Sequence, residues 1–117
     1  MHEELKLIFG NAVVVGTKSI PAAHLRYRGK SKSFVVWTII SNNPEVSGDD
    51  EEIYSVYQVD VDVYSDGDYT EILSAVKTLM KNNGYVWYED SPEMYEEDTG
   101  LYHITATFEK GRYLCQQ

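Results

Sequence analysis

Within the segment 53–64, apolar and polar positions alternate strictly from Tyr57 to Val63, where Tyr57, Val59, Val61 and Val63 are separated by polar residues. An alternation with a period of two is typical of a β-strand that has one buried face. The polar face of such a strand is exposed to solvent or covered by a partner, as in antiparallel sheets. The segment 53–64 therefore predicts a long strand with one apolar and one polar face.

The pattern changes over residues 69–83, where apolar residues recur at spacings of three and four, and this predicts an α-helix lying on a sheet. Asp68 is the expected N-cap, and Glu71 stands three residues later, as in a capping box. Gly84 is a natural left-handed residue just beyond the C-terminal end. The apolar stripe of this helix consists of Tyr69, Ile72, Leu73, Val76, Leu79 and Met80.

The remaining elements have shorter patterns. Residues 34–40 are apolar at nearly every position and rich in β-branched and aromatic side chains, which predicts a central strand. We expect this strand to pair antiparallel with the segment 53–64. Further elements are expected as a short amphipathic helix at 3–9, a small strand or extended segment at 13–15, an edge strand at 23–28, and strands at 85–88 and 101–108.

Together these segments predict an α+β fold: a mainly antiparallel sheet of about four or five strands. One main helix, at about 69–83, and the short N-terminal helix are expected to pack on one face of the sheet. The length of 117 residues predicts a single domain over 1–117. Within it, we expect an acidic mobile loop at about 45–52 and a frayed C-terminal tail at about 110–117.

The charge balance argues against nucleic acid as a partner. Nineteen acidic residues against ten basic ones give a formal net charge of −9, so phosphate would repel the chain and nucleic acid is not expected as the main ligand. Apolar runs are too short to cross a bilayer, so no membrane association is expected. Cys115 is the single cysteine, which excludes an internal disulfide and favours a cytoplasmic compartment.

A search for catalytic chemistry finds no candidate site, and we expect a protein that is not an enzyme and uses no cofactor. A calcium loop that started at Asp62 would place Gly67 correctly at position six, but Leu73 in place of the required glutamate at position twelve. The three histidines lack the spacing of metal ligands. No catalytic, cofactor-binding or metal-binding residue is therefore predicted.

Charged residues are the candidates for an interface. A basic turn lies within a few residues of sequence, whereas acidic residues dominate from Glu45 to Glu97, and opposite patches on one small body suit head-to-tail association. The alternative is that the basic turn and the acidic strand face are simply solvated. The candidate interface residues are Arg26, Arg28, Lys30, Lys32, Asp49, Asp50, Glu51, Glu52, Asp60 and Asp62.

Two motifs resemble a known family. Tyr57-Gln-Val-Asp-Val-Asp-Val-Tyr64 and Tyr95-Glu-Glu-Asp-Thr-Gly-Leu-Tyr-His-Ile104 are similar to segments of the tail-terminator or tail-completion proteins, which are minor tail components of long-tailed bacteriophages and prophages. The resemblance extends over about residues 20–110, and the N-terminal third departs most from the family pattern.

The resemblance implies a virion assembly protein that caps the tail tube as a ring, typically a hexamer, and helps to join the tail to the head. Its partners would be copies of itself, the tail tube and the neck proteins, and it would reach the virion after assembly in the host cytoplasm. A neck connector between head and tail is an alternative within the same particle. A small prophage or bacterial protein-binding domain, with a partner on the polar sheet face, is a second alternative.

Overall fold

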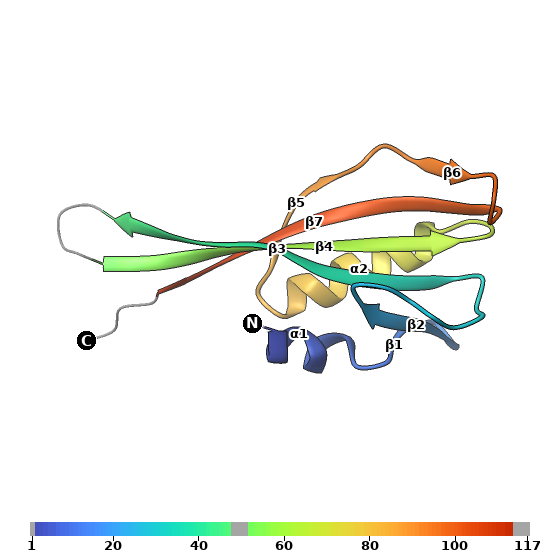
Figure 1. Cartoon of the computed structure of the whole chain (residues 1–117). Coiled ribbons are helices and arrows are strands. Elements are labelled where there is room, and N and C mark those ends of the chain that lie inside the picture. Colours follow the sequence, from blue (N-terminus) through green and yellow to red (C-terminus); the bar gives the residue numbers. More distant parts are fainter. Residues whose placement is uncertain (1, 48–51, 114–117) are drawn as a thin grey trace.

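A computed structural model describes the backbone of residues 2–47 and 52–113 and the side chains of residues 2–40 and 57–110. Two helices and seven strands make up the described chain (Figure 1). In chain order the elements are α1 (His2–Phe9), β1 (Ala12–Val15), β2 (Lys18–His24), β3 (Phe34–Ser47), β4 (Glu52–Ser65), α2 (Thr70–Asn82), β5 (Val86–Asp90), β6 (Met94–Glu96) and β7 (Leu101–Tyr113).

All seven strands belong to one sheet, in the order β1-β2-β3-β4-β7-β5, and β6 pairs with β7 beside β5. The pairing of β2 with β3 is parallel, and the other pairings are antiparallel. The expected α+β fold with a sheet of four or five strands is therefore wrong, because the fold is mostly sheet, with seven strands and two helices. The expected edge strand is also wrong, because β2 lies between β1 and β3. The strands β1 and β6 are four and three residues long, which is too short for a periodic signal, and they form because β2 and β7 supply their hydrogen-bond partners.

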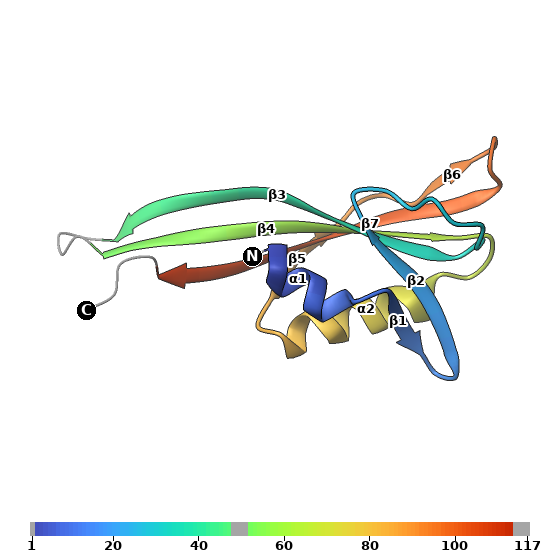
Figure 2. The same ribbon diagram turned by 60° about the horizontal axis from the view of Figure 1, so that its bottom comes forward.

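The core lies between the sheet and the two helices, which cover the same face (Figure 2). Helix α1 buries Leu5 and Phe9. From β4, Val59, Val61 and Val63 have no exposed surface, because their period of two turns them all toward the helices. The residues that α2 buries against them are Ile72, Leu73, Val76 and Met80.

The ends of α2 differ from each other in how well they follow the predicted caps. The N-cap is Tyr69, which makes no side-chain capping bond. Asp68 instead stands one residue before the N-cap and accepts a hydrogen bond from the backbone N–H of Thr70, at 2.9 Å, so the prediction of Asp68 as the N-cap is wrong. At the other end Gly84 has φ +89°, and this confirms it as the left-handed residue that ends the helix.

Three strands continue beyond the part of the sheet that the helices cover, and they form an arm (Figures 1 and 2). Ser47 of β3 pairs with Glu52 of β4, and Tyr54 of β4 pairs with Tyr113 of β7. Residues 45–47 and 52, expected in an acidic loop, are therefore strand residues, as are 110–113, expected in a frayed tail. The other parts of that loop and tail, 48–51 and 114–117, lie outside the described residues. With the arm, the molecule measures 52 × 26 × 22 Å.

Candidate interaction surface

The face of the sheet that carries no helix presents a row of stacked rings. Tyr27 stacks on Phe34 with ring centroids 4.4 Å apart, Phe34 on Tyr64 at 4.6 Å, and Tyr64 on His103 at 4.1 Å. Phe34, Tyr64 and His103 are directly opposite one another in the register of β3, β4 and β7. Cross-strand aromatic pairs of this kind stabilise a sheet, and here they also cover the helix-free face with half-buried rings.

A polar ladder lies beside this row, on β4 and β7. Asp62 accepts a hydrogen bond from the hydroxyl of Thr105, and its Oδ1 lies 2.9 Å from Nε2 of His103. The hydroxyl of Thr107 donates to Oδ1 of Asp60 at 2.6 Å. The two predicted interface carboxylates are thus half-buried and satisfied by residues of the same chain.

Burial changes the acidity of Asp60. Desolvation raises its pKa above the usual range, and the nearby charges of Asp62 and Glu89 act in the same direction, against the opposing hydrogen bond from Thr107. These opposing effects on the pKa are typical of a half-buried carboxylate that accepts a hydrogen bond within a sheet. Among the described residues, no group of three or more histidine, cysteine, aspartate or glutamate side chains could hold a metal ion.

The predicted basic turn is a real surface feature. Arg26, Arg28, Lys30 and Lys32 are all exposed in the connection between β2 and β3. The four residues come together as expected, but they lie far from Glu52, at the end of the predicted acidic loop (Figure 1). The backbone of Glu52 begins β4 at the far end of the arm, whereas the β2–β3 connection lies at the opposite end of the molecule (Figure 1). Asp49, Asp50 and Glu51 lie outside the described residues.

Sequence patterns alone missed an apolar strip along β5 and β6. Its five large side chains are exposed by 43–68% although they are apolar or aromatic. The run from Tyr85 to Tyr88 predicts a strand, but nothing in the run indicates that the strand ends up at the edge of the sheet. The exposed side chains of this strip are Val86, Trp87, Tyr88, Met94 and Tyr95.

Two charged neighbours hold the ring of Trp87 in place. Its indole Nε1–H donates to Oδ1 of Asp90 at 2.8 Å. Lys77 of α2 pairs with the other oxygen of Asp90 at 2.8 Å, and its ammonium nitrogen lies 4.8 Å from the centroid of the Trp87 ring. The ring is therefore oriented by the protein itself, and half of its surface stays exposed.

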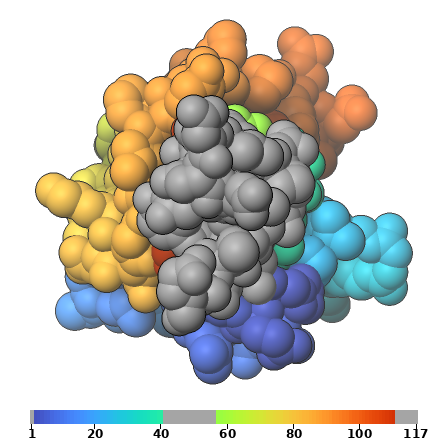
Figure 3. Space-filling view, turned by 90° about the vertical axis from the view of Figure 1, so that its left-hand side faces the viewer, coloured from blue at the N-terminus to red at the C-terminus, as the bar shows by residue number. Residues whose placement is uncertain are grey.

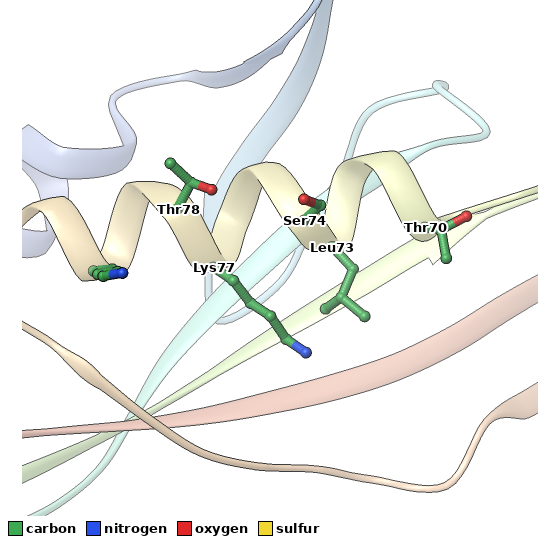
Figure 4. Close-up of a pocket in the computed structure, with 6 residues that line it drawn as sticks. Thr70, Leu73, Ser74, Lys77 and Thr78 are labelled. Atoms are coloured by element: carbon green, nitrogen blue, oxygen red, sulfur yellow. The ribbon is translucent and has the colours of Figure 1, made fainter.

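A shallow groove of about 410 Å³ follows one side of α2, next to this edge (Figure 4). Figure 4 shows the side chains of Lys77 and Leu73 pointing from the helix toward the neighbouring strands. The groove is lined by hydroxyl, aliphatic and lysine side chains and has no carboxylate, thiol or imidazole to form an acid–base pair. The lining residues are Thr70, Leu73, Ser74, Lys77, Thr78 and Lys81.

A comparison with solved structures finds a protein with a similar fold. No protein-family model matches the chain, and no curated protein matches it. Among solved structures, it is similar to a chain from the "Virion of native gene transfer agent (GTA) particle" with a TM-score of 0.51. The similarity covers 90% of this chain and 81% of the other, at 12% sequence identity. Within the described residues, no helix has the length and apolar character that crossing a membrane requires.

Proposed function

We propose that this protein is a structural component of a phage or prophage virion and that it acts without catalysis. The observation that carries the proposal is the similarity of fold to a chain of a gene transfer agent virion, which extends over 90% of this chain. The resemblance of the 57–64 and 95–104 motifs to minor tail proteins supports the same class of function. The described surface supports it too, because its distinctive features are exposed charge and exposed apolar side chains on a seven-stranded sheet.

Within the virion we propose the role of a tail terminator. Copies of the chain would form a ring, of six subunits in the typical family arrangement, that caps the tail tube and offers a surface for the head. Its partners would then be further copies of itself, the tail tube and the neck proteins. The elongated shape supports such a role, because an arm of three strands and a helix-backed body present separate surfaces to separate neighbours.

A neck connector is the second candidate within the same particle. The fold relative is named as part of a virion and not as a particular part of it, so both positions fit the comparison. Both roles need the same properties of the chain, namely self-association and contact with at least one other virion protein.

Electron microscopy of particles made without this protein would test the proposal. We expect tails of abnormal length that are detached from heads, since nothing would halt the tube or dock the head. Normal tails that are detached from heads would favour the neck connector. The control is complementation with the wild-type gene, which should restore joined particles of normal length. Normal-length tails joined to heads in the absence of the protein would contradict both roles.

A further inference from the structure

The strand β5 stands at the end of the sheet order, and in the described chain only β7 pairs with it. An exposed strand edge offers unpaired backbone N–H and C=O groups and is a template for pairing with another chain. Natural edges are normally protected by charge, proline or a covering element. Here the edge carries the charge of Glu89 and a register shift between Trp87 and Glu89. It also presents Trp87 and Tyr88, exposed by 50% and 57%, and Tyr95 of β6 at 55%. A strip of exposed aromatic side chains on an open edge is typical of a protein interface.

The segment 25–32 has the complementary character. It begins with Leu25, an apolar residue that is 62% exposed. The backbone of Leu25 has φ +69°, the only positive φ of a non-glycine residue among those described. Its N–H donates to the carbonyl of Trp37 at 3.0 Å, and the N–H of Arg26 donates to the carbonyl of His24 at 2.7 Å. These bonds hold an uncommon conformation that exposes the leucine side chain.

The charges of the two regions are opposite. Four exposed cations follow Leu25, at positions 26, 28, 30 and 32. The surface of β5, β6 and the turns after them carries exposed carboxylates, which are Glu89, Glu93, Glu97 and Asp98. Complementary potentials of this kind steer association and set its register. Arginine is also the cation best suited to stack on exposed tryptophan and tyrosine rings.

One copy of the chain cannot join these two regions to each other. The strands β3, β4 and β7 lie between β2 and β5, and four strand spacings amount to about 19 Å. Viewed along the long axis, residues 25–33 (cyan) project on one side of the body, and the strands β5 and β6 (orange) lie on another side (Figure 3). Among the described residues, no ion pair joins the basic segment to the acidic aromatic edge of the same copy.

We propose that the open edge of β5 and β6 receives the basic segment 25–32 of a second copy of this chain. The contact is head-to-tail, because the two surfaces are different parts of the molecule, and it forms a ring when its rotation divides a full turn. Leu25 packs on the β5 end of the strip, against Trp87 and Tyr88, because Tyr95 lies six register positions away along β7. The arginines and lysines face the carboxylates. The inference rests on the proposed ring, and it names the surfaces through which that ring forms.

Charge reversal tests the contact. A segment-reversed variant carries Arg26→Glu, Arg28→Glu and Lys30→Glu, and an edge-reversed variant carries Glu89→Lys, Glu97→Lys and Asp98→Lys. The matched control has Lys6→Glu, Lys18→Glu and Lys81→Glu, which changes the net charge as much as the segment-reversed variant does but at other exposed sites. Circular dichroism checks that each variant is folded. Sedimentation velocity at about 50 mM and about 500 mM salt measures association, which should weaken as salt screens the charges.

We expect the wild type and the control to associate, and each reversed variant alone to associate at least about tenfold more weakly. An equimolar mixture of the two reversed variants should associate again. The acidic edge of the segment-reversed variant then meets the basic segment of the edge-reversed variant, and the two reversed surfaces are also opposite in charge. The mixed assemblies should contain the two variants in alternation, which native mass spectrometry detects.

Three results would overturn the inference: a wild type that stays monomeric at about 1 mM in low salt, reversed variants that associate like the control, or a mixture that stays dissociated. The second result alone would leave the proposed ring intact, formed through another surface. Particle morphology tests the proposed function separately.

Discussion

The two tryptophans of this chain lie in two regions that differ in burial. Trp37 lies in β3 under the helices, is 2% exposed, and stacks on Phe9 and His24 with ring centroids 6.1 and 4.2 Å away. Trp87 lies at the edge strand β5, is half exposed, and is oriented by Asp90 and Lys77. The helix-backed centre is thus a closed core, whereas the β5–β6 edge is an ordered but open surface. Changes in the centre should reduce stability, and changes at the edge should reduce association.

The largest effect should come from a charge placed in the closed region. Val76 of α2 has no exposed surface and belongs to the core cluster. Val76→Asp buries a carboxylate without a partner, which costs more than about 4 kcal/mol and should leave the domain unfolded. Circular dichroism and chemical denaturation would measure the loss. The control is Thr78→Asp on the exposed side of the same helix, and a folded Val76→Asp protein would contradict the position of this residue in the core.

The direct comparison replaces each tryptophan with alanine. Trp37→Ala removes a buried aromatic side chain and should lower the free energy of unfolding by about 3–5 kcal/mol. Trp87→Ala removes a half-exposed ring and one hydrogen bond, and should lower it by about 1 kcal/mol or less. Urea denaturation of both variants measures the difference. Equal losses of stability would show that the edge is part of the core.

A smaller effect should appear in the pH dependence of the polar ladder. Because the pKa of Asp60 is raised in the folded state, mainly by burial, its ionisation opposes folding. This cost is absent at a pH below the unfolded pKa and complete at a pH above the folded one. Asp60→Asn can still accept the hydrogen bond from Thr107, so the stability of the variant relative to wild type should rise from about pH 3 to neutral pH.

Denaturation at a series of pH values would measure this trend. The control is Asp98→Asn, which removes an exposed carboxylate and therefore relieves no burial. If the stability of Asp60→Asn relative to the wild type fell as the pH rises, the pKa of Asp60 would not be raised in the folded state.

The smallest effect concerns a single phenol near the start of α2. The hydroxyl of Tyr69 donates to Oε2 of Glu93 at 2.5 Å, and this bond is the main cause that raises the pKa of Tyr69 to about 12. Glu93→Gln removes the negative acceptor and should lower that pKa toward its ordinary value of 10.0. A spectrophotometric titration of the tyrosines, with Tyr69→Phe to identify the signal, would measure the shift. An unchanged titration would mean that the bond does not form in solution.

Sequence patterns could predict the elements in which the spacing of apolar residues repeats often enough to identify the buried face. The alternation of Val59, Val61 and Val63 and the stripe of α2 each repeat several times, and each repeat is a separate observation of the same buried face. Gly84 could be predicted as well, because the left-handed conformation excludes most other residues. The exposed basic turn followed from its composition alone.

Other features could not be predicted, because they depend on which strands become neighbours. The strand β6 was not predicted and forms beside β7. The segment 13–15 was expected as a strand or an extended segment, and pairing with β2 makes it the strand β1. The strands β3 and β4 include Glu45 and Glu52, although the acidic composition there is typical of a loop. These residues are in strands because β3 and β4 pair with each other. The half-burial of Asp60 and Asp62 likewise follows from the cross-strand threonines that donate to them.

By itself, the sequence determined that the long elements exist, which of their faces is apolar, and that the chain carries a strong negative charge with one local basic segment. Only the tertiary structure decided that Trp37 is enclosed while Trp87 is exposed, although both lie in predicted strands. The physical reason is that periodicity records the two faces of an element, whereas its place at the centre or edge of the sheet is set by contacts with residues distant in sequence.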